Sequence, residues 1–403
     1  MRSRTLRILH LAYEDPLQPG SGGGSIRAHE INRRLADRHQ ITALVAGYPG
    51  AKPRMEDGVR WVPIGPRTGA RVDRLAYFAL LGLEVFRRPH DLVVEEFGAP
   101  FSVGFSPLFT RKPVVASVQW LFASQMREKY GLPFDRVERS GLGFYDRFIA
   151  VSEWLARDLR SRRPGADVVT IPNGVEEIAY EARPTSPKHL LFVGRLDLAH
   201  KGGDFLFDIY DRIRRRRGGH VPPLVIVGDG PDRDVMERLV VRSGLSGLVR
   251  FRGRVEGAEK YQLMADAHAV LMPSRHETFG MVAIESLAAK APLVAFDVGP
   301  LREVVGLETG ARLVRPYDLD AFAREVNQLI DTPTLAGELR GAGRRWARRY
   351  DWEEIATRQE EYYLRATQDV TPRRHGADGR LQKISATQQD AQVGKKRVAR
   401  AGS

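Results

Sequence analysis

The sequence alternates short buried-strand patterns with amphipathic helical patterns, and this alternation runs through the chain twice. In the first pass, strand-like runs occur at 6–12, 41–46, 91–94, 113–118, 147–151 and 168–171. In the second pass they occur at 190–193, 224–227, 249–251, 269–272 and 293–296. Strands that alternate with helices form parallel sheets covered by helices. The predicted fold class is therefore α/β, with two doubly wound Rossmann-like domains facing a central cleft.

The two passes also set the expected domain boundaries. The N-terminal domain covers 1–176, a proline-containing linker covers 177–188, and the second domain covers 189–345. An amphipathic helix at 346–367 is expected to pack back toward the N-terminal domain, and a basic tail at 368–403 is expected to be disordered. A chain of 403 residues with 42% hydrophobic content is long enough to bury two cores.

Composition argues against several classes of protein. The chain has no cysteine, which excludes a disulfide framework, a thiolate metal site and a cysteine nucleophile. Its apolar stretches, such as 75–86 and 265–272, are shorter than the roughly 20 residues that span a bilayer. We expect a cytoplasmic location, which includes the inner face of the membrane. The net charge is +13, but no aromatic residues interleave with the basic runs, so we expect no nucleic-acid partner.

Two glutamates, Glu277 and Glu285, flank the start of an apolar helical pattern. If 278–280 opens the helix, Glu277 lies at its N-terminal end and Glu285 lies inside it, facing the same cleft. Two carboxylates could bind hydroxyl groups at the two ends of one ligand, as a sugar nucleotide with a ribose and a hexose requires. The alternative is a helix with one solvated and one capping glutamate.

Cations and glycines follow other predicted strands. Arg195 follows the strand at 190–193, and Lys201 lies at the start of the next helix, so together they could neutralise a diphosphate. The run 20–25 (GSGGGS) follows the first strand and would let backbone N–H groups approach a phosphate. A pair of surface cations and a flexible turn are the alternatives for these two features.

Several segments, in this order along the chain, resemble the family-4 retaining glycosyltransferases. In the first half they are 22–23 (GG), 150–153 (AVSE) and 171–175 (IPNGV). In the second half they are 192–196 (FVGRL), 201–202 (KG), 225–231 (VIVGDGP), 273–280 (PSRHETFG) and 284–287 (IESL). The resemblance implies a GT-B architecture, in which the N-terminal domain binds the acceptor and the C-terminal domain binds the nucleotide-sugar donor.

The resemblance also assigns roles to single residues. The implied donor site comprises Gly23, Gly24, Arg195, Lys201, Glu277, Phe279, Gly280 and Glu285. Glu277, Arg195 and Lys201 are the implied catalytic residues: the two cations hold the diphosphate, and Glu277 lies near the anomeric carbon of the hexose. Glu285 holds the ribose. No metal and no cofactor are expected, because two cations neutralise the leaving group, and a UDP-sugar is favoured over a GDP-sugar as donor substrate.

One position departs from the family. Members often carry a histidine after the strand that here covers 114–118, and this chain has Gln119 followed by Trp120. A glutamine amide can hydrogen-bond a sugar hydroxyl but cannot act as a base. The predicted acceptor-side residues are Gln119, Trp120 and His29, and His29 or Glu96 could assist the proton transfer.

The resemblance implies transfer of a hexosyl group, with retention, from a nucleotide-diphosphate sugar to a hydroxyl acceptor. That acceptor would belong to an envelope glycan, a glycolipid or a small metabolite, and the basic surface would suit peripheral contact with an anionic membrane. The alternatives are a GT-B sugar phosphorylase, a sugar-nucleotide epimerase, or a non-catalytic protein that binds sugar nucleotides.

Overall fold

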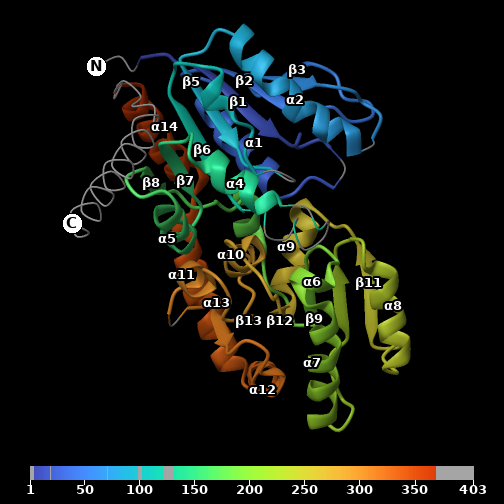
Figure 1. Cartoon of the computed structure of the whole chain (residues 1–403). Coiled ribbons are helices and arrows are strands. Elements are labelled where there is room, and N and C mark those ends of the chain that lie inside the picture. The colour runs from blue at the N-terminus through green and yellow to red at the C-terminus, as the bar shows by residue number, and fades with distance from the viewer. Residues whose placement is uncertain are drawn as a thin grey trace, which may run out of the picture. The chain divides into compact units, whose positions relative to one another are not determined.

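The computed structural model describes residues 4–368, apart from 19, 70, 99–101, 122, 124–126, 128–130, 132 and 308. It contains two parallel-sheet α/β domains, which confirms the predicted fold class (Figure 1). Within the described residues, no helix is both long and apolar enough to cross a membrane. The expected basic tail, 368–403, lies outside the described residues except for Gln368, which ends the last helix.

The first sheet has eight strands in the order β3-β4-β2-β1-β5-β6-β7-β8. The strands are β1 (Arg7–Tyr13), β2 (Gln40–Ala46), β3 (Arg54–Glu56), β4 (Val59–Ile64), β5 (Leu92–Glu96), β6 (Val114–Val118), β7 (Arg147–Ala150) and β8 (Asp167–Thr170). β5 and β6 are buried at every position, as expected for a parallel sheet covered on both faces. Only the short hairpin β3–β4 is antiparallel among these pairs, and the strand patterns above omit it. Its signal is the dipeptide Asp57-Gly58, whose residues both have positive φ, as a two-residue hairpin turn requires.

Helices cover both faces of this sheet. They are α1 (Gly23–Leu35), α2 (Arg71–Arg87), α4 (Phe134–Leu142) and α5 (Glu153–Arg162), with a 3-10 turn η1 (Ser106–Leu108). Ala28 and Ile31 of α1 are buried in one core cluster with Ile8, whereas Tyr77 and Leu81 of α2 are buried in the other. The alternation of side chains along β1 places one cluster on each face of the sheet.

The second sheet has six strands in the order β11-β10-β9-β12-β13-β14, all paired in parallel. The strands are β9 (His189–Val193), β10 (Leu224–Val227), β11 (Val249–Gly253), β12 (Ala267–Met272), β13 (Leu293–Phe296) and β14 (Ala311–Val314). The helices are α6 (Leu198–Lys201), α7 (Gly203–Arg216), α8 (Arg233–Arg242), α9 (Gly257–Ala265), α10 (Met281–Ala288), α11 (Leu301–Val305), α12 (Leu319–Asp331) and α13 (Pro333–Ala347). Because β9 lies between β10 and β12, the strand order is that of a dinucleotide-binding fold.

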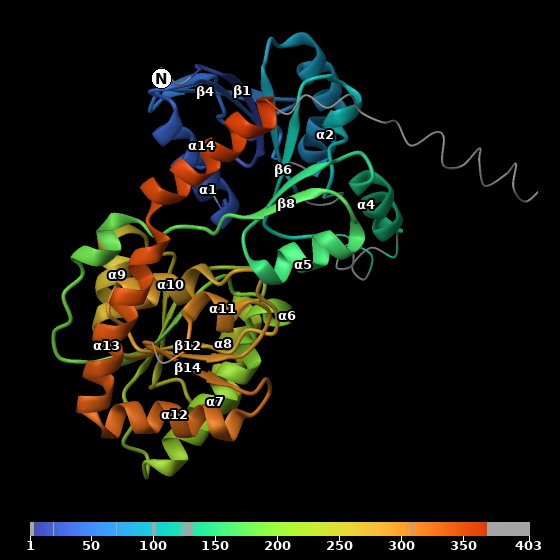
Figure 2. The same ribbon diagram turned by 90° about the vertical axis from the view of Figure 1, so that its left-hand side faces the viewer.

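The last helix returns to the first domain. After α13 come a 3-10 turn η3 (Arg348–Tyr350) and α14 (Trp352–Gln368), whose apolar side packs with Ile8 in the core cluster under α1 (Figure 2). This helix begins at Trp352 and not at 346, because the Asp351 carboxylate accepts hydrogen bonds from the N–H groups of Glu353 and Glu354 and so caps a new helix. The expected linker contains another 3-10 turn, η2 (Glu177–Glu181).

Candidate functional site

The strand order of the second sheet reverses at β9, since β10 lies on one side of it and β12 on the other. Ligands of doubly wound sheets bind outside the carboxyl ends of the strands at such a switch point. Arg195 lies in the segment after β9, and Glu277 lies in the loop after β12. The two loops that border the switch point therefore carry both residues.

Lys201 and Glu277 meet across these loops. The Lys201 Nζ donates to the Glu277 Oε1 at 2.5 Å, and the Glu277 side chain is only 7% exposed. Arg195 is exposed, and its guanidinium forms no hydrogen bond or ion pair with the residues that the structure describes. The site thus has one cation paired with a buried carboxylate and a second cation open to an anionic ligand.

The turn that carries Lys201 is fixed from several sides. The Asp232 carboxylate accepts from the Leu198 N–H at 2.7 Å, at the start of α6. Gly202 ends α6 with φ of 65°, and a Cβ at this position would lie 2.1 Å from the Pro273 carbonyl oxygen. Only glycine allows this conformation together with this approach to the end of β12.

Arg275 joins the two loops directly. Its guanidinium donates to both carboxylate oxygens of Asp204, at 2.7 and 2.6 Å, and to the Leu198 carbonyl at 2.6 Å. A bidentate pair of this kind is strong and directional. Arg275 therefore holds the Lys201 turn from the Glu277 loop, a role that the sequence patterns did not assign, although Arg275 lies inside the segment 273–280.

Glu285 lies in the buried part of α10, where only 7% of the residue is exposed. Burial raises the pKa of Glu285 above its usual range, and the Lys260 ammonium, 3.1 Å from Oε1, opposes that effect. No sequence signal marked Lys260, because a lysine near the start of a helix is an ordinary surface residue. The carboxylate therefore has one charged partner within a largely apolar helix.

Phe279 and Gly280 shape the start of α10. The Phe279 side chain is 4% exposed and packs edge-on against Tyr350, with the ring centres 5.8 Å apart. Gly280 has φ of 97°, and a Cβ there would lie 2.5 Å from a Leu301 methyl carbon. The structure thus places Phe279 in the core, where it positions the loop and offers no open aromatic face.

The first sheet has its own switch point at β1, between β2 and β5. The chain after β1 leads to the glycines at the start of α1. A Cβ on Gly24 would lie 3.0 Å from the Gln119 Nε2, and one on Gly23 would lie 3.5 Å from the Met281 Cγ, at the start of α10. The glycine segment therefore contacts Gln119 in its own domain and the helix of Glu285 in the other.

Gln119 leads to a buried polar chain. Its Nε2 lies 3.5 Å from the Glu96 Oε2, and the Glu96 Oε1 lies 3.3 Å from the Nε2 of the buried His10. The His10 Nδ1 lies 2.8 Å from the Asn32 Oδ1. His10 and Asn32 had no predicted role, because a histidine inside a strand pattern is more often a core residue than a functional one.

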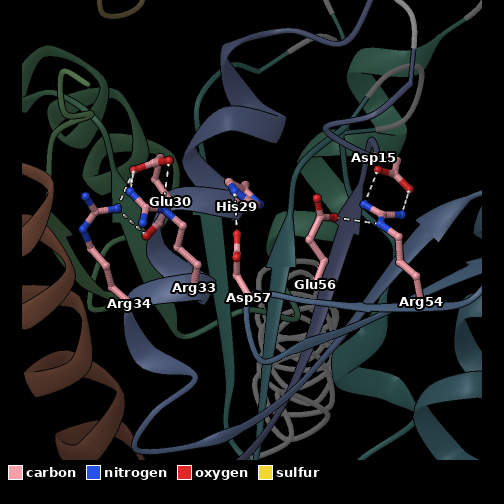
Figure 3. A network of polar contacts seen from close by, with 8 residues as sticks. All are labelled: Asp15, His29, Glu30, Arg33, Arg34, Arg54, Glu56 and Asp57. Atoms are coloured by element: carbon pink, nitrogen blue, oxygen red, sulfur yellow. Dashed lines mark hydrogen bonds and ion pairs between the residues drawn. The ribbon is translucent and has the colours of Figure 1, made fainter. Parts of the chain in front are cut away.

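Two other predicted acceptor-side residues lie in different places. Trp120 is edge-on to His200 of α6, with ring centres 5.5 Å apart, so it lies beside the Lys201 turn. His29 has its Nε2 3.4 Å from the Asp57 Oδ2, among the ion pairs of α1 and the β3–β4 hairpin (Figure 3). Its ring also stacks on Trp61, with the ring centres 6.2 Å apart. Among the described residues, His29 thus contacts the hairpin and not Gln119.

In the described part of the chain, no three histidine, aspartate or glutamate side chains gather as metal ligands would.

Comparison with known families matches both halves of the chain. Residues 21–177 match the family described as Glycosyltransferase Family 4, and residues 187–332 match Glycosyl transferases group 1. A glycogen synthase of Mycobacterium tuberculosis is 33% identical, and the alignment covers 90% of this chain and 95% of that protein. A phosphatidyl-myo-inositol mannosyltransferase of Mycobacterium leprae is 32% identical over 52% of this chain and 56% of its own.

Solved structures show the same fold. Sucrose-phosphate synthase from Thermosynechococcus elongatus matches with a TM-score of 0.73 at 21% identity, over 90% of this chain and 99% of the other. The Anabaena protein HepE, solved in complex with UDP-glucose, matches with a TM-score of 0.69 at 19% identity, over 89% of this chain and 99% of the other. These likenesses identify the arrangement of the two α/β domains as the GT-B fold.

Proposed function

The chain belongs to the group 1 and family-4 glycosyltransferases, and from this membership we propose that it is a retaining hexosyltransferase that uses a nucleotide-diphosphate sugar. The proposed acceptor is a hydroxyl group of an envelope glycan, a glycolipid or a small metabolite. One observation carries the proposal: the Lys201–Glu277 ion pair lies at the switch point of the second sheet, and the segment after β9 adds the unpaired Arg195.

The proposed donor site uses each charged group for one part of the ligand. Arg195 and Lys201 bind the diphosphate, and the ammonium of Lys201 can contact a phosphate oxygen while it stays beside Glu277. Glu277 accepts hydrogen bonds from the hexose near its anomeric carbon. Glu285 accepts from the ribose hydroxyls, with Lys260 holding its carboxylate.

The glycine segment closes the proposed site from the first domain. Gly23 and Gly24 have no side chains, so their backbone N–H groups can approach the phosphates. Gly23 already lies against Met281, at the start of the helix that carries Glu285. We propose that 1–176 acts as the acceptor-binding domain and 189–345 as the donor-binding domain, joined by 177–188 and by the return of α14.

The proposed reaction is a front-face transfer. The bond between the anomeric carbon and the diphosphate oxygen breaks, and its electron pair leaves on that oxygen. The acceptor oxygen bonds to the anomeric carbon from the same face, and its proton passes to the leaving phosphate. Arg195 and Lys201 stabilise the charge that develops on the diphosphate, a contribution of about 100- to 1,000-fold for each well-placed group. Neither a metal nor a covalent nucleophile takes part in this proposal.

We propose a UDP-sugar as donor in preference to a GDP-sugar. The fold of HepE, which was solved with UDP-glucose, supports a test that begins with that compound. The proposed location is cytoplasmic, with peripheral contact at the inner, anionic face of the membrane.

The test is the hydrolysis of UDP-glucose in the presence of EDTA, followed by proton NMR, with GDP-mannose as the comparison donor. We expect release of UDP and of α-glucose as the first anomer, because retention preserves the α configuration of the donor. β-Glucose as the first product would overturn retention, and loss of turnover in EDTA would overturn the metal-free mechanism. Turnover that requires orthophosphate would indicate a phosphorylase. Conversion of UDP-glucose to an isomer would indicate an epimerase, and binding without turnover would indicate a non-catalytic protein.

A further inference from the structure

One side of α2 carries apolar side chains into solvent. Val72, Leu75, Leu83 and Phe86 are 51%, 49%, 44% and 78% exposed. These positions, together with Ala79, recur at the spacing of one helical stripe. The opposite side of the helix holds the buried Tyr77, Leu81 and Val85. Surface helices normally carry polar residues on the side that faces water, so this helix has two apolar sides and only one of them is packed.

The 3-10 turn η1 enlarges the exposed apolar area. Leu108 and Phe109 are 56% and 43% exposed. Phe109 lies against the helix, since a Cβ on Gly82 would come within 2.6 Å of its ring. We call this set the α2 surface, and it comprises Val72, Leu75, Leu83, Phe86, Leu108 and Phe109. A contiguous exposed apolar area with polar edges marks an interaction site.

Cations border the α2 surface. Arg87 is exposed at the end of α2, and Arg111 and Lys112 are exposed just after η1. The His90 Nε2 lies 2.8 Å from the Thr110 Oγ1, which ties these two basic segments together. Near the other end of α2, the exposed Arg74 is hydrogen-bonded to the Tyr13 side chain, on the side of the helix away from the stripe. The basic border of the stripe therefore lies at the C-terminal end of α2.

The carboxylates of α2 do not offset these cations at the surface. Asp73 is buried and accepts from Thr68 and Gly69. Glu84 is bonded to Arg88 at 2.6 Å. The helix thus presents an apolar stripe with a basic border at its C-terminal end.

We propose that the α2 surface docks on an anionic lipid bilayer, with the apolar stripe in the boundary between headgroups and acyl chains. The cations at its edges would contact the headgroup phosphates. Burial of apolar area together with attraction between cations and anionic lipids is how interfacial helices bind membranes. A second copy of the chain is a poorer partner, because both carboxylates of α2 are already hydrogen-bonded within the chain and are not free to pair with these cations.

The buried side of α2, opposite the α2 surface, contacts the last residue of β1, from which the chain leads to the glycine segment of the site. The Tyr77 hydroxyl accepts from the N–H of Tyr13, the last residue of β1, at 3.1 Å, and the two rings pack edge-on. The chain continues from Tyr13 to Gly22 and Gly23. Docking would therefore hold the domain that carries this segment on the bilayer, where lipid-borne acceptors with free hydroxyl groups are found. This last step rests on the proposed function, whereas docking does not.

The experiment is flotation of the full chain with vesicles made either of phosphatidylcholine alone or of equal parts phosphatidylcholine and phosphatidylglycerol. The apolar variant is Leu75→Ser with Leu83→Ser and Phe86→Ser, and its control is Val241→Ser, an exposed valine on α8. The charge variant is Arg87→Gln with Arg111→Gln and Lys112→Gln. Its control is Arg238→Gln with Arg242→Gln, two exposed arginines on α8.

We expect the wild-type chain to float with the anionic vesicles and to bind phosphatidylcholine vesicles much less. Removal of each cation should weaken binding about fivefold, the effect of roughly 1 kcal/mol per charge near an anionic surface, and the apolar variant should lose at least about tenfold. The α8 controls should bind like the wild type, and the unfolding temperature of the apolar variant should fall only slightly, because its three side chains are 44–78% exposed.

Equal binding to both kinds of vesicle, no binding, or full binding by the apolar variant would overturn the proposal. If the wild type is a dimer and the apolar variant is a monomer, the proposal would also be overturned, and the α2 surface would be a site of self-association. Turnover of UDP-glucose without vesicles is measured separately, so a failure of docking can be told from a failure of the proposed function.

Discussion

Lys201 Nζ and Glu277 Oε1 lie 2.5 Å apart, although 76 residues separate them in the sequence. The pair connects the helix turn after β9 with the loop after β12, the two strands that meet at the switch point. Glu277 is nearly buried while Lys201 is 26% exposed, so the ammonium is the partner that a ligand can reach. An anionic donor would therefore meet a cation whose position a buried carboxylate already fixes.

Lys201→Met should lower the turnover of UDP-glucose about 100-fold or more, because it removes a positioned cation from the developing charge. Arg195→Met should have a similar effect on turnover without lowering the unfolding temperature, since the Arg195 guanidinium is exposed and forms no hydrogen bond or ion pair with the described residues. The control is Arg315→Met, which removes an exposed arginine just after the edge strand β14, away from the switch point. Turnover, UDP affinity and thermal unfolding are measured for all three variants. Normal turnover in Lys201→Met would contradict its role.

Gly202→Ala should destabilise the chain more than Gly257→Ala. Both glycines have positive φ, 65° and 58°, so both substitutions carry the cost of a left-handed alanine, about 1–2 kcal/mol. At Gly202 the new Cβ would also lie 2.1 Å from the Pro273 carbonyl oxygen, whereas at Gly257 nothing lies within 4 Å. Denaturant unfolding measures the difference, and turnover should fall only in Gly202→Ala because the Lys201 turn must move. Equal unfolding free energies would show that the turn relaxes without cost.

Glu285→Gln should stabilise the ligand-free chain increasingly as the pH rises. The pKa of Glu285 is raised by burial above its usual value of 4.5. A raised pKa in the folded state means that the carboxyl favours folding when protonated, and this contribution is lost as the pH rises through the folded-state pKa. Between about pH 4 and pH 8, the unfolding temperature of the variant should rise relative to that of the wild type. The affinity for UDP should weaken in the variant. A stability of the wild type that increases with pH relative to the variant would contradict the predicted sign of the pH dependence.

The sequence predicted the fold and the loops of the site better than it predicted the contacts inside them. The buried strands β5 and β6 each begin with an apolar run, 92–94 and 114–116, so their pattern is plain. Chain order then places Arg195 and Glu277 after strands of one sheet. The 2.5 Å pairing of Lys201 with Glu277 depends on the turn at Gly202, and no pattern in the sequence carries that tertiary geometry.

It was hardest to predict whether a given aromatic or histidine side chain faces the core or the site. Phe279 follows Glu277 closely in the sequence, yet its ring packs on Tyr350 in the core. His10 and His29 lie on either side of the first glycine segment in the sequence. Only His10 joins the chain of contacts to Gln119 through Glu96, whereas His29 contacts Asp57. Which of two histidines faces a site depends on strand and helix registers that spacing alone does not fix.

Arg275→Met should lower turnover although Arg275 is not one of the proposed donor-binding residues. The reason is that Arg275 positions the Lys201 turn through Asp204 and Leu198. The loss in stability should be about 1.5 kcal/mol, at the low end for a hydrogen bond to a charged group, since the Asp204 side chain is 39% exposed. A displacement of the Lys201 turn by about 1 Å could cost on the order of 100-fold in turnover.

Arg275→Lys should recover part of both losses, because an ammonium can contact Asp204 but cannot reproduce the bidentate pair and the bond to Leu198 together. The control is Arg212→Met, which removes an exposed ion pair with Asp320 and should change the unfolding free energy by less than about 0.5 kcal/mol. Denaturant unfolding and the kcat and KM for UDP-glucose hydrolysis are measured for each variant, for Asp204→Asn alone, and for Arg275→Met combined with Asp204→Asn. If the two substitutions add without coupling, or if Arg275→Met keeps normal kcat, then the Lys201 turn holds its place without Arg275.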